Sequence, residues 1–313
     1  MFNKIIEDKH CFVYCGPERC NCAAGNRMTK QFTMDDTLPK MWEECRKQDV
    51  ELLFASDVGS HSWGFARETS DWDIKFLYKH NDNDKYLGLN EPMQHFSFKL
   101  DDKAEFVGYD IRKYLGLLLK GNANVYEMAN SQYIFEPNAN TSRSIRNFTV
   151  DALKENLEKV AAHFYGLAQS TYKQRVSNVA EPTSKKWLYI IRPLLCCEYI
   201  FRFNSLPPLE FDKLLTNCQM PLTVWGKTTS ILEDRRNGVE AVYDMAAVEE
   251  WATEQLAFWK RHLENISQYR VPEDENPLTT HENFDRIYRE LLNGRFRHPL
   301  PDYPGYAMNS INS

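Results

Sequence analysis

The chain has 313 residues, more than the ~100–200 of a usual domain, so one large domain or two modest ones are expected. Its composition, 42% hydrophobic and 26% charged, excludes a wholly disordered chain, a collagen and a coiled-coil rod. Without a signal peptide or an apolar run of the ~20 residues that cross a bilayer, a cytoplasmic protein with no membrane partner is expected. The net charge of −6 argues against nucleic-acid binding through overall charge, but it leaves a local basic cleft open.

Helix and strand patterns alternate in the first part of the chain. Residues 38–48 predict an amphipathic helix, because apolar residues recur there at spacings of three and four. Strands are predicted over these ranges: 50–56, 73–78, and one or two within 96–107. Asp110 is a good N-cap for a helix that runs to Lys120, with Gly121 as its C-terminal stop.

Helical periodicity dominates the rest of the chain. Helices are predicted over these ranges: about 150–175, 184–203, 207–218, 239–269 and 281–293. Pro193 is expected to kink or break the second of these helices at Ile191–Arg192, because proline lacks the backbone N–H. Strands followed by a run of helices indicate an α/β (α+β) fold, in which a module with a short mixed sheet precedes an all-helical module.

Four cysteines cluster beside His10 near the start of the chain: Cys11, Cys15, Cys20 and Cys22. They are candidate zinc ligands, although structural zinc sites favour paired C-x₂₋₄-C knuckles that lie far apart in the sequence. In a chain without a secretion signal, an ordinary reduced segment is the favoured alternative.

One short segment carries the residues best suited to chemistry. A predicted strand leads into Gly59-Ser60, and Ser70-Asp71-x-Asp73 opens the next strand. Gly59 lets the backbone approach a ligand closely, and a helix N-terminus just after it would offer N–H groups to phosphate. Asp71 and Asp73 lie two apart on a strand, so they point to the same side. Their mutual repulsion would be relieved by a divalent cation such as Mg²⁺.

This pattern resembles the signature of the DNA polymerase β-like nucleotidyltransferase superfamily. Further stretches are similar to the YcgL-type branch of predicted nucleotidyltransferases, which includes enzymes associated with RNA ligase and assigned to RNA repair. These stretches are Trp63–Ala66, Gly108–Lys113, Leu118–Asn122, His163–Ala168, Lys185–Leu194 and Pro207–Phe211. The resemblance covers about residues 50–240.

The resemblance implies a role for each residue of the signature. Asp71 and Asp73 would ligate Mg²⁺ or Mn²⁺, while Ser60, Ser70 and the Gly59 backbone would hold the triphosphate of a bound NTP. Two metal ions would bridge the attacking hydroxyl and the α-phosphorus.

The superfamily also needs a third carboxylate on a neighbouring strand, as a metal ligand that helps to deprotonate the acceptor hydroxyl. Glu105 and Asp110 are the two candidates. Glu105 is favoured because it lies in a predicted strand, where the branch tends to carry Asp. Asp110 has the alternative of being only the N-cap of the next helix.

The helical module is expected to supply positive charge to the β- and γ-phosphates. Lys185, Tyr189 and Arg192 share one helix face at offsets of four and three, and Lys186 adjoins them. Two alternatives stay open. Lys185 and Lys186 could form a solvated pair in the first helical turn, and Arg192 could be a buried ion-pair partner.

The predicted function is transfer of a nucleoside monophosphate from an NTP to a hydroxyl, preferably that of an RNA end, with release of pyrophosphate. The expected organisation is an extension (1–37), a catalytic domain (38–148), a helical domain that closes the cleft (149–296) and a tail (297–313). The alternatives are a nucleotidyltransferase that AMPylates protein and a catalytically silent module that binds nucleotide or RNA. The sequence predicts neither the nucleotide nor the oligomeric state.

Overall fold

The computed structural model describes residues 32–176, 183–239, 241–267, 278 and 280–298. Thr33–Ser313 form one compact unit, and every structural statement below concerns this unit. The cysteine cluster Cys11–Cys22, most of the predicted N-terminal extension and most of the predicted tail lie outside the described residues. The zinc hypothesis for that cluster therefore stays a prediction.

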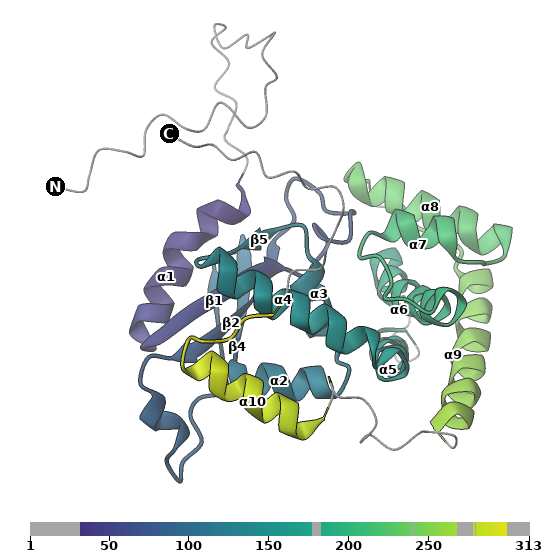
Figure 1. The fold of residues 1–313 in the computed structure, drawn as a ribbon. Helices are drawn as coiled ribbons and strands as arrows, with labels where there is room; N and C mark the ends of the chain where they lie inside the picture. Colours follow the sequence, from purple (N-terminus) through teal and green to yellow (C-terminus); the bar gives the residue numbers. More distant parts are fainter. Residues whose placement is uncertain (1–31, 177–182, 240, 268–277, 279, 299–313) are drawn as a thin grey trace, which may run out of the picture. The chain divides into compact units, whose positions relative to one another are not determined.

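A five-stranded sheet forms the core of the first part of this unit (Figure 1). Its strands are β1 (Val50–Asp57), β2 (Trp72–His80), β3 (His95–Leu100), β4 (Ala104–Asp110) and β5 (Ile134–Phe135). They lie in the order β3-β4-β2-β1-β5. The β2–β4 pair is parallel and the other neighbouring pairs are antiparallel. The short mixed sheet and the strands expected from the sequence are confirmed.

The register between β2 and β4 determines which side chains meet at one end of the sheet. Asp73 of β2 pairs with Glu105 of β4. Burial alternates at the start of β2, where Trp72 and Ile74 are buried while Asp73 and Lys75 are only partly buried. Because neighbouring side chains on a strand point to opposite faces, Asp73 and Lys75 share one face and Trp72 and Ile74 the other.

Ten α-helices are described: α1 (Leu38–Lys47), α2 (Ile111–Leu119), α3 (Ala123–Asn130), α4 (Ala139–Lys154), α5 (Leu157–Arg175), α6 (Ser184–Phe203), α7 (Phe211–Asn217), α8 (Leu222–Arg236), α9 (Ala246–Ser267) and α10 (His281–Leu292). Short 3₁₀ helices span Met34–Thr37 and Asn83–Tyr86. Among the described residues no strand follows β5, so the predicted α+β fold with a helical second part is confirmed. The helix expected over about 150–175 is two helices, and neither α3 nor α8 was expected.

Helix α6 continues through Pro193 without a break. Of the kink or break expected at Ile191–Arg192, the break does not occur. Residues on both sides of the proline are buried, namely Ile190, Ile191, Leu194 and Leu195. Their packing into the core keeps the helix continuous in spite of the missing N–H donor.

Helix α2 begins and ends where the sequence indicates. The Asp110 side chain accepts a hydrogen bond of 2.8 Å from the backbone N–H of Arg112, so Asp110 is the N-cap. Gly121 follows the helix with a φ of +64°, the left-handed conformation that favours glycine. Because Asp110 is both the last residue of β4 and the N-cap of α2, the helix begins directly after the strand, and it contacts the sheet.

One continuous hydrophobic core joins the sheet to the helices. It includes Phe54 and Leu77 from the strands together with Phe164, Trp187 and Phe211 from the helical part. Figure 1 shows α5 to α9 gathered beside the sheet-containing part of the unit. Within the described residues, no helix is both long enough and apolar enough to cross a membrane.

Candidate active site

Asp57, the last residue of β1, organises the loop that follows. Its Oδ2 accepts hydrogen bonds from the backbone N–H groups of Gly59 at 3.2 Å and Ser62 at 2.9 Å. Its Oδ1 accepts a third from the N–H of Asp73 at 3.2 Å. The carboxylate is fully buried, and burial raises its pKa. Asp57 thereby connects the loop after β1 to the start of β2.

Gly59 has no room for a side chain. A Cβ at this position would lie 2.1 Å from Oδ2 of Asp73, far inside van der Waals contact. The glycine is therefore required because the Asp73 carboxylate packs directly against the backbone. Sequence reasoning had attributed the same glycine to the close approach of a ligand.

Residues 59–64 form turns and not a helix. The predicted helix N-terminus after Gly59 is therefore wrong. Two of the N–H groups that it would have offered to phosphate, those of Gly59 and Ser62, donate to Asp57 instead. The turns form because this buried carboxylate satisfies the loop donors that a helix would leave open.

Neither predicted serine faces the cavity described below. Ser60 is buried, and the Ser70 hydroxyl accepts a 2.9 Å hydrogen bond from a backbone N–H three residues earlier, which closes a turn. Neither residue is among those that line the cavity. Their role in holding a triphosphate stays a prediction.

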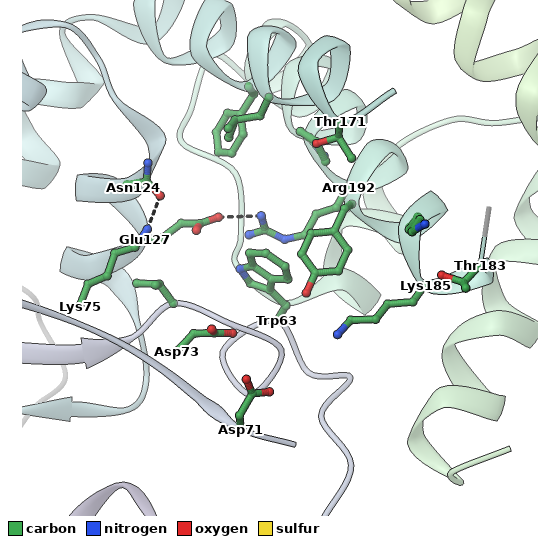
Figure 2. A pocket seen from close by; sticks show the side chains of 16 residues that line it. Trp63, Asp71, Asp73, Lys75, Asn124, Glu127, Thr171, Thr183, Lys185 and Arg192 are labelled. Carbon is green, nitrogen blue, oxygen red and sulfur yellow. Dashed lines mark hydrogen bonds and ion pairs between the residues drawn. The ribbon is translucent and has the colours of Figure 1, made fainter. Parts of the chain in front are cut away.

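Asp71 and Asp73 both line one cavity (Figure 2). Asp71 is exposed and Asp73 is partly buried. Burial raises the pKa of Asp73 to about 6, and the negative charges of Asp71 and Asp57 add to that rise. Lys75 and Lys185 act in the opposite direction. The mutual repulsion expected of two neighbouring carboxylates is thus present, and a bound cation would relieve it.

The third carboxylate has one candidate beside Asp73 and one far from it. Glu105 pairs with Asp73 in the β2–β4 register, but it is exposed and lies 3.4 Å from Lys99. Asp110 pairs with Tyr78, five residues along β2 and thus roughly 16 Å away at ~3.3 Å per residue. It is buried, caps α2 and accepts a hydrogen bond from the Tyr86 hydroxyl. The structure therefore places Asp110 away from the aspartate pair, whereas Glu105 lies in register beside Asp73 but does not line the cavity described below.

No group of three His, Cys, Asp or Glu side chains is close enough to hold a metal ion in the part of the chain that the structure describes. Asp71 and Asp73 alone offer a pair of hard oxygen ligands on one side of β2. A pair suits a cation that keeps water and substrate oxygens as its other ligands.

The cavity has a volume of about 540 Å³, large enough for a nucleotide-sized ligand. Its lining comes from β2, α3, α5, α6 and the loop after β1: Val58, Trp63, Asp71, Asp73, Lys75, Asn124, Glu127, Phe164, Leu167, Thr171, Thr183, Lys185, Lys186, Tyr189, Arg192 and Pro193. The carboxylates of β2 therefore face the basic helix α6 across one cavity, as the sequence predicts.

Lys185, Lys186 and Tyr189 line the cavity as expected. Figure 2 shows the Lys185 side chain reaching toward Asp71 and Asp73. Its Nζ lies 5.8 Å from the ring centre of Tyr189. Burial lowers the pKa of Lys185, and the positive charge of Arg235 lowers it further, while the two aspartates raise it. Arg235 is thus a second positive charge near Lys185, and two such charges are expected at a site that neutralises several phosphate oxygens.

Arg192 is a buried ion-pair partner. Its Nη1 lies 2.7 Å from Oε1 of Glu127, and its Nε and Nη2 donate to the carbonyl oxygen of Leu209 at 3.3 and 3.2 Å. The guanidinium also lies 4.4 Å from the ring centre of Trp63. These contacts fit the alternative of a buried ion-pair partner. Arg192 also lines the cavity, and its role in phosphate binding stays a prediction.

Several lining residues were not identified from the sequence, among them Lys75, Asn124 and Glu127. Lys75 donates a hydrogen bond to Asn124, and Glu127 lies one turn further along α3. The signal for Lys75 was present, because it follows Asp71 and Asp73 at the same spacing of two. Asn124 and Glu127 depend on α3, which was not expected.

The chain matches the model of a family described as "RlaP: RNA repair pathway DNA polymerase beta family" over residues 34–289. Among curated proteins it is similar to "Uncharacterized protein YcgL" of Bacillus subtilis (strain 168). The two are 26% identical over 191 residues, which is 61% of this chain and 72% of the relative.

A search of solved structures finds a nucleotidyltransferase-like protein from Exiguobacterium sibiricum 255-15, with a TM-score of 0.25 and 10% sequence identity. The match covers 83% of this chain and 91% of that one. A similarity of this size carries no argument about fold or function.

Proposed function

The chain belongs to the RNA repair pathway DNA polymerase beta family, and we propose that it transfers a nucleoside monophosphate from an NTP to the hydroxyl of an RNA end. The observation that carries the proposal is the cavity of about 540 Å³ in which Asp71 and Asp73 face Lys185 and Lys186. This charge arrangement suits a polyanionic ligand, which would contact a cation held by the two aspartates on one side and the lysines on the other.

In the proposed reaction the acceptor oxygen forms a bond to the α-phosphorus, and the bond from that phosphorus to the oxygen that bridges to the β-phosphate breaks. Pyrophosphate leaves with the electron pair of the broken bond. Lys185 and Lys186 neutralise its negative charge from their side of the cavity. The proton of the acceptor hydroxyl passes to a carboxylate, for which Glu105 is the candidate because of its register beside Asp73.

Asp71 and Asp73 would hold Mg²⁺ or Mn²⁺, because hard oxygen ligands and a raised Asp73 pKa fit a divalent cation. When bound, the cation would neutralise charge on the triphosphate and lower the pKa of the acceptor hydroxyl. Trp63 and Phe164 form apolar parts of the cavity lining, against which a nucleobase could pack.

The test is incorporation of α-labelled NTP into single-stranded RNA in the presence of Mg²⁺. We expect the double variant Asp71→Asn with Asp73→Asn to lose incorporation. The matched control is Glu250→Gln with Glu254→Gln, which removes two exposed carboxylates from α9 and leaves the cavity lining unchanged. Incorporation that survives in the first variant, or that is lost equally in both, contradicts the proposal.

The same experiment separates the two alternative functions. Label that enters protein and not RNA would identify an AMPylating enzyme. Nucleotide that binds without release of pyrophosphate, with every acceptor offered, would identify a silent binding module.

A further inference from the structure

Glu127 places a buried carboxylate in the wall of the cavity. Its side chain is 8% exposed, and its Oε1 pairs with Nη1 of Arg192 at 2.7 Å. Figure 2 shows the carboxylate between the side chains of Arg192 and Lys75. Within the part of the chain that the structure describes, no hydrogen bond reaches its second oxygen, Oε2. Because a buried carboxylate oxygen without a donor is costly, we expect a group outside the chain to donate to it.

Lys75 approaches the same carboxylate from the sheet. It donates a hydrogen bond to Oδ1 of Asn124, which holds its ammonium group in place. Burial lowers the pKa of Lys75, whereas the negative charges of Glu127 and Asp73 raise it. Lys75 and Glu127 therefore attract each other, although among the described residues they form no direct ion pair. A hydroxyl would bridge them, because it accepts a hydrogen bond from an ammonium group and donates one to a carboxylate.

The position of Lys75 along the cavity matches the sugar of a bound nucleotide. Lys75 follows Asp73 by two residues on the same face of β2, which is roughly 7 Å at ~3.3 Å per residue. If the aspartates and Lys185 hold the phosphates, the part of the ligand nearest to Lys75 is the group joined to the α-phosphate. In an NTP this group is the ribose, which carries the 2′- and 3′-hydroxyls.

A phosphate and a base both fit the free oxygen of Glu127 less well. A phosphate oxygen carries negative charge, and a buried carboxylate repels it. The base has an apolar surface to pack against elsewhere in the lining, at Trp63 and Phe164. We propose that Glu127 accepts a hydrogen bond from a ribose hydroxyl of the bound nucleotide while Lys75 donates to the same hydroxyl, an inference that rests on the proposed function.

This contact would select nucleotides that carry the hydroxyl. A carboxylate is also the acceptor for a ribose hydroxyl in dinucleotide-binding folds. A site whose buried groups hydrogen-bond a substrate hydroxyl rejects the analogue that lacks it, because those groups are then left unpaired. Glu127 and Lys75 are such groups.

The test measures nucleotide binding without any need for catalysis. Isothermal titration calorimetry, with Mg²⁺ and without an acceptor, first identifies which of the four NTPs binds best. It then compares this NTP with its 2′-deoxy and 3′-deoxy analogues. We expect one analogue to bind roughly 10–100-fold more weakly, which identifies the hydroxyl that Glu127 contacts. At that position fluorine donates no hydrogen bond and should bind as weakly as hydrogen, whereas an amino group donates one and should bind nearly as well as the hydroxyl.

Glu127→Gln tests the residue itself. The glutamine oxygen can keep the bond to Arg192, while its amide nitrogen replaces the free oxygen and accepts nothing. The NTP and its deoxy analogue should then bind equally. Glu136→Gln is the matched control, because Glu136 also pairs with an arginine at 2.7 Å, Arg146, but does not line the cavity. It should discriminate as the wild type does, and thermal melting reports whether each variant keeps its fold.

The inference is overturned if both deoxy analogues bind like the NTP, if the fluoro analogue binds like the hydroxyl, or if no NTP binds. It is also overturned if Glu127→Gln keeps the discrimination of the wild type, or if this variant loses only a preference between bases. Selection for the hydroxyl without pyrophosphate release, with every acceptor offered, would support the contact and contradict the proposed function. Incorporation of the NTP and both deoxy analogues with equal kcat/KM would do the reverse.

Discussion

Arg192 of α6 and Glu127 of α3 form an ion pair of 2.7 Å whose side chains are only 4% and 8% exposed. The pair lies in the wall of the cavity and connects α3 to α6, the helix that carries Lys185 and Lys186 (Figure 2). Arg192 also donates to Leu209 and lies over Trp63. This pair therefore joins the sheet-containing part of the unit to its helical part.

Removal of one partner should destabilise the protein strongly. Glu127→Leu or Arg192→Met leaves an unpaired buried charge, so we expect each to lower the free energy of unfolding by about 3–5 kcal/mol, whereas the double variant should lose less than the sum. Urea denaturation measures the free energy of unfolding of the single and double variants. The control is Lys213→Met, which breaks an exposed 2.6 Å pair with Glu210 and should cost about 0–1 kcal/mol. Equal losses in the buried and exposed cases would contradict the prediction.

Gly59→Ala should lower activity without a general loss of fold. Its Cβ would lie 2.1 Å from Oδ2 of Asp73 and force that carboxylate to move. A misplacement of about 1 Å in a catalytic group can cost ~10²-fold in rate, and we expect a loss of that order. NTP incorporation and thermal melting are the measurements.

Gly226→Ala is the control for this substitution, because Gly226 lies inside α8 and no atom would meet its Cβ within 4 Å. Activity should be unchanged, and the free energy of unfolding should rise by about 0.4–1 kcal/mol. If Gly59→Ala keeps full activity, the close packing of Asp73 against the loop is not needed for catalysis.

The part of the site that follows strand alternation could be predicted from the sequence. Asp71, directly before β2, and Asp73 within it are two residues apart and line the same cavity, and the same rule places Lys75 with them. The basic face of α6 was likewise predictable from helical spacing. These features depend only on local geometry, which a short sequence pattern specifies.

The parts that depend on tertiary contacts were not predictable. The role of Asp57 comes from loop N–H groups that turn back onto its carboxylate, and no periodicity reports such a turn. The sequence left open whether Arg192 serves the cavity or a buried ion pair, and its partner Glu127 lies on a short helix that was not expected. Pro193 lies inside α6 because the core packs on both of its sides.

The two candidates for the third carboxylate should respond differently to neutralisation. Glu105→Gln should lower the rate of NTP incorporation by about 10²–10⁴-fold if Glu105 assists deprotonation of the acceptor. Asp110→Asn should keep activity, because Asn still caps α2 and the residue is five positions away from Asp73 along the β2 register. Retained activity in Glu105→Gln, or loss in Asp110→Asn with an intact fold, would reverse the assignment.

Mg²⁺ affinity should depend on pH through Asp73. Burial raises the pKa of this carboxyl to about 6, so a proton competes with the cation below that pH. We expect the apparent Kd for Mg²⁺ to rise roughly tenfold for each pH unit below about 6 and to be flat above it. Calorimetric titration at pH 5 and 7.5 tests this. A Kd independent of pH would mean that Asp73 does not hold the cation.

The stability of the metal-free protein should also depend on the ionisation of Asp73. It should fall as the pH rises, whereas the affinity for Mg²⁺ should increase. The folded pKa of Asp73, about 6, lies above the unfolded value of ~3.9. Between these two pH values the folded state holds a proton on Asp73 that the unfolded state has lost. The stability that this proton contributes is fully present below about pH 4 and is lost as the pH rises through about 6. Asp73→Asn removes this titration, so its melting temperature should gain on the wild type between pH 4.5 and 7.5. Excess Mg²⁺ should abolish this gain, because the cation replaces the proton on the carboxylate. A constant difference in melting temperature between the two proteins over that range would show that Asp73 ionises at the same pH in the folded and unfolded states.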